Sequence, residues 1–355
     1  YSAAYCLNFR AENSVSTAVE KALSAAWARR AACAALQDSN ALRVFHGAGE
    51  VLHDGSQESA LLKSLSVDRF GEHAWVTLWE VHDTDRQQFE KLLQKPLCDF
   101  FRQHFASAVL QSRPGKGRIH DPVVLFGEPP AAHCTVHEGS AQYRVQMHGV
   151  KHPGLFLDHA PLRAWLIGNS KNLRVLNTFA YTGSLSVAAA LGGAAHVTTL
   201  DLSKATMRWA QENGELNGLC DDRARWIAGD VFEWLPRLKR EIAQGKQPAF
   251  DMVIADPPSF SRGEKGVFST AKDLTALHVL LLGVLAPNGL LVTSINSAQI
   301  SWAQYEKDLL QAAQQRQCHL QVLQRLEQPS SFPNWLDEQA DERYLKGFIL
   351  RAMKV

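Results

Sequence analysis

The sequence is poor in cysteine, and the cysteines that it has do not lie at motif spacings. Six cysteines are scattered over 355 residues, at positions 6, 33, 98, 134, 220 and 318, and no Cys-x-x-Cys pair occurs. Zinc sites and small disulfide frameworks need closely spaced cysteines, so this pattern argues against both. We therefore expect no metal site, free thiols and a cytoplasmic protein.

Long apolar runs and an excess of charge are also absent. No apolar run reaches the length of a membrane span and no signal-peptide pattern opens the chain, so we expect no membrane association. The formal net charge is +1, from 37 basic and 36 acidic residues, so a nucleic-acid-binding surface must be local. The chain opens with Tyr1 rather than Met, and we expect the natural N-terminus to be missing or processed.

Acidic residues follow short apolar strands in the middle of the chain. The pattern predicts strands at residues 175–179, 196–201, 225–228 and 250–255, with helices between them. Asp201, Asp230 and Asp256 lie at or just after the last three of these strands. Because ligands of an open α/β sheet bind beyond the carboxyl ends of its strands, the three acids predict a nucleoside-binding site with chemistry beside it.

The turn after the first of these strands reads Phe-Ala-Tyr-Thr-Gly-Ser and holds a single glycine, Gly183. A dinucleotide fold shows Gly-x-Gly-x-x-Gly, which lets a pyrophosphate sit on the helix N-terminus. S-adenosylmethionine has no phosphate and needs no such cradle, so we favour it over NAD. Asp201 follows at about the 20-residue spacing that suits ribose hydroxyls. The alternative for Asp201 and Asp230 is a helix N-cap, because both precede helical runs.

Length and composition suit more than one globular domain. Hydrophobic residues make up 46% and charged residues 21% of the chain, which is ordinary for globular proteins. We predict an N-terminal helical segment at 1–40, an α+β substrate- or RNA-binding domain at 41–150 and a cofactor-binding α/β domain at 151–355. Within the second region we predict a helix at 89–110 and a strand at 108–111, which overlaps the end of that helix. The basic loop from Arg113 to Arg118 that follows it is either a phosphate contact or a solvated hairpin tip.

A sharper signal follows the fourth strand. The motif Asp256-Pro-Pro-Ser-Phe260 resembles the Asp-Pro-Pro-Phe/Tyr motif of class I methyltransferases that act on nitrogen atoms of nucleobases. With the other motifs, the chain resembles the bacterial large-subunit (23S) ribosomal RNA methyltransferase family, which holds 5-methylcytosine and 7-methylguanine enzymes. The further matching stretches are Arg43–Glu50, Leu65–Gly71, Gly149–Lys151, Gly154–Asp158, Phe179–Gly183, Asp201–Lys204 and Tyr344–Phe348.

The chain departs from the family pattern in two places. The family's Thr and Gln-Arg are replaced by His152 and by His159-Ala160. No PUA-like RNA-binding domain can be placed in residues 1–40, because they read as helix and coil.

The resemblance implies a class I methyltransferase fold, α/β and Rossmann-like, with seven strands of which the last is antiparallel, and a smaller N-terminal α+β domain. It implies S-adenosyl-L-methionine as the cofactor, RNA (23S rRNA) as the partner, and residues 151–355 as the methyltransferase domain. The implied cofactor contacts are Asp201, Leu202 and Ser203 at the ribose, Asp230 and Val231 at the adenine, Phe179, Tyr181, Thr182 and Gly183 at the methionine part, Asp158 at its ammonium, and Asp256. The implied acceptor-base contacts are Asp256, Pro257 and Pro258 at a base edge and Phe260 stacked on the base. The alternative for Phe260 is a core aromatic.

We predict methylation of a base nitrogen, with guanine before adenine, and not of carbon 5 of cytosine. That carbon needs a cysteine thiolate to add to the ring first. Serines stand at the corresponding places, namely Ser259, Ser294 and Ser297, and no histidine lies near them in the sequence. A methyltransferase for a small molecule or protein and a non-catalytic RNA-binding module remain alternatives. We expect phosphate contacts from Arg262 and Lys265, and a dimer.

Overall fold

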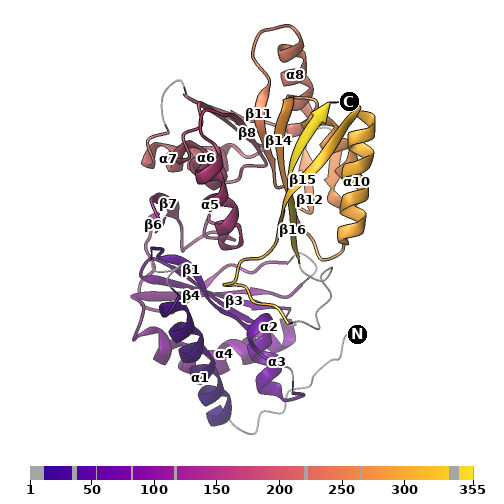
Figure 1. The fold of residues 1–355 in the computed structure, drawn as a ribbon. Coiled ribbons are helices and arrows are strands. Elements are labelled where there is room, and N and C mark those ends of the chain that lie inside the picture. Colours follow the sequence, from indigo (N-terminus) through magenta and orange to yellow (C-terminus); the bar gives the residue numbers. More distant parts are fainter. Residues whose placement is uncertain are drawn as a thin grey trace. The chain divides into compact units, whose positions relative to one another are not determined.

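The computed structural model describes residues 12–33, 38–52, 54–80, 83–115, 118–219, 223–263, 266–335 and 344–354. The chain divides into two compact units (Figure 1). The N-terminal unit holds Tyr1–Leu157 together with Ser330–Trp335, and the C-terminal unit holds Asp158–Pro329 and Leu336–Val355. The domain boundary near residue 150 remains a prediction.

A five-stranded mixed sheet forms the centre of the N-terminal unit. Its strand order is β1-β2-β3-β4-β5, in which only β3 and β4 run parallel. Apolar residues of α1, α3 and α4 pack on this sheet as one buried cluster. The elements are α1 (Glu12–Ala31), β1 (Ala41–His46), α2 (Gly47–Glu50), α3 (Gln57–Lys63), β2 (Leu65–Phe70), β3 (His73–Trp79), α4 (Asp83–Phe101), β4 (Ser107–Arg113), β5 (Val123–Phe126), β6 (Cys134–Glu138) and β7 (Ala141–Val145).

The helix predicted at 89–110 is wrong at both ends. It runs from Asp83 to Phe101, and residues 107–113 form β4 instead. β4 pairs in parallel with β3, so its backbone groups bond to a sheet that is distant in sequence. Tertiary pairing of this kind overrides a local helical pattern.

The segment Ser330–Trp335 belongs to the N-terminal unit although it lies close to the end of the chain. The Arg43 guanidinium lies 4.2 Å from the ring centroid of Phe332 and also donates to both carboxylate oxygens of Asp68, at 2.7 and 2.8 Å. The Trp335 indole N–H donates to the Ala48 carbonyl at 3.1 Å. Ring stacking and hydrogen bonds therefore fix this segment against β1 and α2.

The C-terminal unit is built on a seven-stranded sheet with the order β10-β9-β8-β11-β14-β16-β15. The first five of these strands are parallel, and β16 is antiparallel to both of its neighbours. This confirms the predicted Rossmann-like methyltransferase sheet with its antiparallel last strand. The elements are η2 (Leu157–His159), which begins on the last residue of the other unit, α5 (Ala160–Asn169), β8 (Arg174–Thr178), α6 (Ser184–Leu191), β9 (His196–Asp201), α7 (Lys204–Leu216), β10 (Ala224–Ala228), α8 (Val231–Ala243), β11 (Phe250–Ala255), β12 (Phe260–Gly263), β13 (Gly266–Ser269), α9 (Thr270–Leu282), β14 (Leu285–Asn296), α10 (Trp302–Gln315), β15 (Cys318–Leu326) and β16 (Leu345–Lys354).

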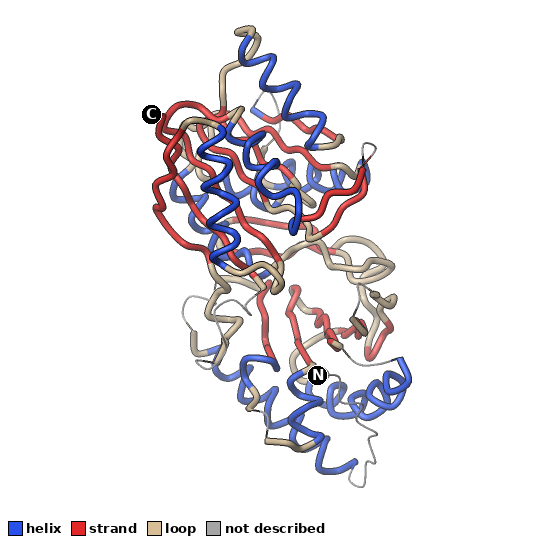
Figure 2. Tube along the Cα trace, turned by 90° about the vertical axis from the view of Figure 1, so that its right-hand side faces the viewer, coloured by secondary structure: helices blue, strands red, loops and turns tan. Residues whose placement is uncertain are grey.

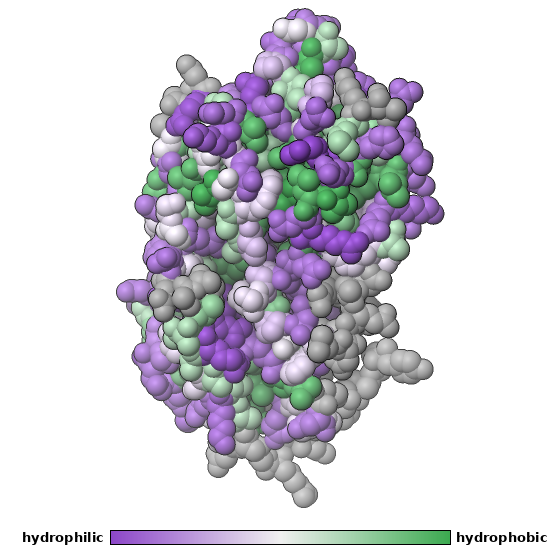
Figure 3. Space-filling view, viewed as in Figure 1, coloured by the Kyte–Doolittle hydropathy of each residue, from purple (hydrophilic) through white to green (hydrophobic). Residues whose placement is uncertain are grey.

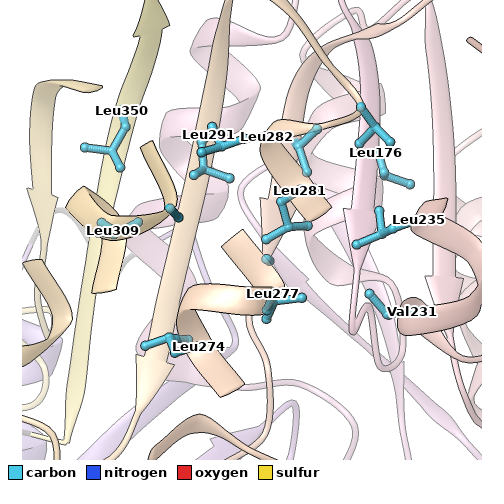
Figure 4. Packing of buried hydrophobic residues seen from close by; sticks show 14 of the residues in the cluster. Leu176, Val231, Leu235, Leu274, Leu277, Leu281, Leu282, Leu291, Leu309 and Leu350 are labelled. Carbon is cyan, nitrogen blue, oxygen red and sulfur yellow. The ribbon is translucent and has the colours of Figure 1, made fainter. Parts of the chain in front are cut away.

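Helices cover both faces of this sheet (Figures 1 and 2). Successive strand residues alternate between two buried clusters, with Leu176 in one and Val175 in the other. The first cluster contains residues of α8, α9 and α10, and the second contains residues of α5 and α6. Figure 4 shows Leu235 and Leu277 from two of these helices gathered with Leu291 of the sheet. Burial on both faces explains why the strands read as continuous apolar runs.

β15 is the edge strand of this sheet. Val322 and Leu323 on β15 and Met353 on β16 are exposed hydrophobic residues. Hydrophobic surface gathers at the upper right of Figure 3, where Figure 1 places β15 and β16. No helix in the described part of the chain has both the length and the apolar character that a membrane span requires.

Candidate functional site

The carboxyl ends of the parallel strands form one edge of the C-terminal sheet. The strand register aligns Ala255 with Thr178 on one side and with Thr293 on the other. It also aligns Thr178 with Leu200, the residue before Asp201. The turn after β8, Asp201 and the motif that starts at Asp256 therefore emerge at the same edge, as the sequence predicted.

The turn between β8 and α6 has an unusual backbone. Phe179 and Tyr181 have positive φ angles of 54° and 49°, and Gly183 follows with 76°. Side chains larger than glycine rarely adopt such angles, and they concentrate at sites where a fixed backbone serves a ligand. The Thr182 carbonyl accepts a hydrogen bond from the Asn213 amide of α7 at 2.9 Å, which fixes the turn from behind.

Asp201 stabilises the same turn. Its Oδ2 accepts from the Tyr181 backbone N–H at 2.8 Å, and its Oδ1 accepts from the Ser203 backbone N–H at 3.0 Å. An ionised carboxylate offers about four lone-pair positions, so each oxygen retains capacity for a ribose hydroxyl. Burial raises the pKa of Asp201, against the lowering effect of the bonds from Ser203 and Tyr181. Asp201 is not a helix N-cap, because the cap of α7 is Ser203.

Asp230 is the N-cap of α8, which is the alternative that the sequence left open. Its Oδ1 accepts from the Phe232 backbone N–H at 2.8 Å. The described contacts use only this oxygen, so the second one suits an amino group of a ligand. Val231, the first residue of α8, is buried in the core cluster, and Leu202 is 45% exposed.

Asp158 carries a polar atom that suits a cationic ligand. Its side chain is buried, and its Oδ1 has no hydrogen-bond partner among the described residues. A buried acceptor without a donor costs about 1–3 kcal/mol, so a position of this kind is typical of a ligand site.

Asp256 is held by two donors that lie far from it in the sequence. The Ser294 hydroxyl donates to Oδ1 at 2.6 Å, and Nε2 of His159 lies 3.1 Å from Oδ2. The His159 side chain is 8% exposed and the Asp256 side chain 25% exposed, so the carboxylate still reaches the surface of the site.

The two groups change each other's ionisation. Burial alone raises the pKa of Asp256, but the charge of His159 and the hydrogen bonds from His159 and Ser294 outweigh it, and the pKa falls below its usual value. Burial alone lowers the pKa of His159, but Asp256, by charge and hydrogen bond, and the charge of Asp158 raise it above the usual value against the charge of Arg163. The pairing therefore favours the imidazolium form of His159 and the carboxylate form of Asp256.

The other predicted base-contact residues follow Asp256 in the same motif. Pro257 is buried and Pro258 is exposed. Phe260 is 57% exposed and starts β12, so it is not a core aromatic. The Ser259 hydroxyl donates to the Asn296 carbonyl at 2.7 Å, which joins the motif to the end of β14.

The predicted phosphate contacts fall largely on residues of which no side chain is described. Lys116, Gly117 and Lys265 lie outside the described residues, and the Arg262 side chain is not described. Arg113 and Arg118 lie on either side of residues 116 and 117 in the predicted basic loop, and this loop belongs to the N-terminal unit.

His159 and Ser294 were not predicted as site residues. Ser294 was weighed only as a nucleophile, and His159 only as a departure from a family motif. Both residues lie far from Asp256 in the sequence, and the sequence argument considered only histidines close to the serines. One signal in the sequence pointed to His159 as a site residue, namely that it directly follows Asp158 in the matching motif.

No cysteine of the described C-terminal unit lies at this edge. Cys318 starts β15 and pairs with Lys354, at the end of β16 remote from Leu345. Leu345 pairs with Asn296 at the carboxyl end of β14, so Cys318 lies at the opposite edge of the sheet. Cys220 lies outside the described residues. The described part of the chain also contains no cluster of side chains that could hold a metal ion.

Comparison with known proteins gives a family that matches most of the chain. Residues 42–349 match a family described as S-adenosylmethionine-dependent methyltransferase. The ribosomal RNA large subunit methyltransferase I of Tolumonas auensis is 28% identical over 303 residues, which cover 83% of this chain and 73% of that protein. A ribosomal RNA large subunit methyltransferase of Deinococcus radiodurans is 30% identical over 298 residues, covering 82% of this chain and 69% of that protein.

Two further comparisons differ in extent. The ribosomal RNA large subunit methyltransferase K/L of Shewanella sp. (strain ANA-3) is 39% identical over 161 residues, 45% of this chain and only 22% of that protein. The chain thus spans about a fifth of the length of this longer relative. The crystal structure of SMU.776, assigned as a methyltransferase and complexed with SAH, superposes with a TM-score of 0.80 at 25% identity, covering 95% of this chain and 81% of that one.

Proposed function

Because this chain belongs to the S-adenosylmethionine-dependent methyltransferase family, we propose that its acceptor is RNA and that it methylates a base nitrogen, guanine before adenine, of large-subunit rRNA. The relatives that match most of the chain are named for large-subunit ribosomal RNA, which supports the substrate class. The local arrangement of the site supports the choice of a nitrogen atom.

The cofactor-binding part of the proposal rests on the turn after β8 and the acids beside it. Asp201 binds the ribose hydroxyls with its remaining lone pairs, and the free oxygen of Asp230 accepts from the adenine amino group, with Val231 beside the ring. Asp158 holds the ammonium group, and the backbone of the turn orients the methionine part. S-adenosylmethionine brings an activated methyl group, so the residues of the chain chiefly position the reactants.

The acceptor-binding part rests on the motif after β11. Asp256 and the Pro257 carbonyl hold a base edge, and the exposed Phe260 stacks on the base, a contact of about 1–3 kcal/mol in single-stranded recognition. The base has to leave its helical stack to reach them. RNA phosphates meet the basic residues of the 113–118 loop and Arg262 and Lys265.

The observation that carries the choice of nitrogen is the ionised Asp256 beside serines. The Ser294 hydroxyl already donates to Asp256, whose pKa is lowered, so this carboxylate is a weak base and does not activate the serine. A nitrogen atom uses its own lone pair and needs no covalent step.

The substrate is tested by methyl transfer from tritiated S-adenosylmethionine. Unmodified large-subunit rRNA, bulk protein and a small-molecule extract are offered separately, and labelled RNA is digested to nucleosides for mass spectrometry. We expect label in rRNA, on methylguanosine. Label in protein or small molecules instead would favour the second function class of the same fold. Cofactor binding without transfer to any acceptor would favour a non-catalytic RNA-binding module.

The chemistry is tested with RNA that contains 5-fluorocytidine. A cytosine carbon-5 enzyme would be trapped on this RNA as a covalent adduct that survives denaturing electrophoresis. We expect no adduct. An adduct mapped to a cysteine would refute the nitrogen assignment and show which thiol reaches the base.

A cytoplasmic location and a dimer remain part of this proposal. Light scattering of the purified chain across a concentration series measures its mass and tests the dimer directly.

A further inference from the structure

We propose that His159 is a positioning residue for methyl transfer: together with Ser294 it fixes the orientation and the negative charge of Asp256 toward the acceptor base. This inference rests on the proposed function, because it gives Asp256 the acceptor as its partner. It concerns a residue outside the motif that carries the resemblance to base-nitrogen methyltransferases.

The first argument is that the two donors bind different oxygens of one carboxylate. Ser294 on β14 occupies Oδ1 at 2.6 Å, and His159 at the start of α5 occupies Oδ2 at 3.1 Å. Two donors that come from separate elements remove the rotation of the Asp256 side chain. The carboxylate plane is thereby set by the sheet and by α5, and not by the acceptor when it binds.

The second argument is that His159 has no other structural task in the described contacts. It occupies the N-cap position of α5, but its side chain makes no capping hydrogen bond. Its ring is buried and its resolved polar contact is to Asp256. The residue is therefore placed for the carboxylate and not for the helix.

The third argument concerns the cost of the pair. A buried ion pair gains little net stability over apolar residues of the same size, because both charges lose water. Here Asp256 keeps 25% of its side chain exposed while His159 keeps 8%, so the negative member faces the site and the positive member supports it from inside. The exposed part of the carboxylate keeps lone pairs that can accept from the acceptor base, although each oxygen already has one donor.

The charged groups that face His159 agree with this role. Asp256 and the adjacent Asp158 favour its protonated form, and Arg163 of α5 opposes it. Asp158 is also the residue whose unpartnered oxygen suits the cofactor ammonium. His159 thus contacts Asp256, the side chain proposed to bind the acceptor, and directly follows Asp158, the side chain proposed to bind the cofactor.

The matched variants follow from the family motif, which has glutamine at this position. His159→Gln keeps a neutral N–H donor, whereas His159→Ala removes the donor. His319→Ala serves as the control, because His319 is exposed on β15 at the opposite edge of the sheet. Cofactor affinity is measured for each variant by calorimetry, and methyl transfer to unmodified rRNA by tritium counting.

We expect His159→Ala to lower kcat/KM for rRNA by about 10-fold to 100-fold, the range for one hydrogen bond to a charged group. His159→Gln is expected to recover most of this loss, and S-adenosylmethionine affinity to change less than threefold in both. The Asp256→Asn variant should lose activity too, and adding His159→Ala to it should cost no more than threefold further. A purely structural role predicts instead that the losses multiply and that the glutamine variant is no better than alanine, which would overturn the inference.

A second measurement separates this inference from the proposed function. The His159 ring is titrated by nitrogen-15 NMR in the full chain with S-adenosylhomocysteine bound. We expect its pKa to fall in Asp256→Asn, whereas an unchanged titration would refute the pairing. If the wild type transfers no label to RNA, the proposed function fails and the NMR result still decides whether His159 and Asp256 act as a pair.

Discussion

Replacement of Asp201 by alanine tests the cofactor assignment most directly. The carboxylate accepts the backbone N–H groups of Tyr181 and Ser203 in the structure, and the proposal adds two ribose hydroxyls. The variant therefore removes bonds of two kinds, one set within the chain and one set to the cofactor.

The two losses have different magnitudes. The Tyr181 N–H is partly buried, so its lost partner costs about 1–3 kcal/mol of folding stability, while the exposed Ser203 N–H turns to water. A hydrogen bond to a charged group contributes about 1.5–3 kcal/mol, so the loss of two ribose bonds weakens binding by at least about 100-fold.

Isothermal titration with S-adenosylhomocysteine and with its 2′,3′-dideoxy analogue separates the two effects. The wild type should bind the analogue far more weakly, whereas Asp201→Ala should bind both compounds with nearly equal, low affinity. Ser301→Ala is the control, because it removes the N-cap hydrogen bond of α10, after the carboxyl end of β14, and leaves the Asp201 carboxylate in place. Chemical unfolding without ligand measures the stability term for each variant.

The reasoning is refuted if folded Asp201→Ala still discriminates between the two compounds as the wild type does. It is also refuted if Ser301→Ala lowers the affinity as strongly, because the loss would then reflect a loosened sheet edge and not ribose recognition.

Three further predictions concern stability and RNA binding. The raised pKa of His159 means that its charge stabilises the folded state fully below about pH 6.5 and that this stabilisation is lost as pH rises through the folded-state pKa, so the unfolding free energies of wild type and His159→Gln should converge as the pH rises above about 6.5. Asp230→Ala should lower the free energy of unfolding by about 0.5–2 kcal/mol, because the cap of α8 is lost. Asp230→Asn should keep most of this stability, since asparagine also caps helices, and equal losses in chemical unfolding would contradict the capping role. Replacing Lys116 and Arg118 should flatten the salt dependence of RNA binding by about one unit of slope per lost phosphate contact, and an unchanged slope would count against the loop.

The sheet and its edge could be predicted because they depend on local patterns. Apolar strands that end in acids, a turn with one glycine and the motif at Asp256 are each contained in a few consecutive residues. The seven strands and the antiparallel last strand follow from the resemblance, and the structure confirms both. The cap of Asp230 was visible as an alternative, since a cap and a ligand contact use the same residue type at the same place.

The rest depends on contacts that join distant parts of the chain. Residues 108–110 were predicted both as the end of a helix and as part of a strand, and the pairing of β4 with β3, which leaves no local mark, decides for the strand. The His159–Asp256 pair joins residues nearly a hundred positions apart, and no periodicity connects them. The positive φ angles of Phe179 and Tyr181 are likewise invisible in the sequence, because neither residue type favours them.

The docked segment Ser330–Trp335 limits how this protein can be divided in the laboratory. A recombinant fragment that stops at Leu157 would lack Phe332, against which the Arg43 guanidinium stacks, and Trp335, which bonds to α2. A single cut therefore cannot yield the N-terminal unit with its full set of contacts. A faithful fragment has to join Ser330–Trp335 to the first 157 residues through a designed linker, and circular permutation through this segment offers another route.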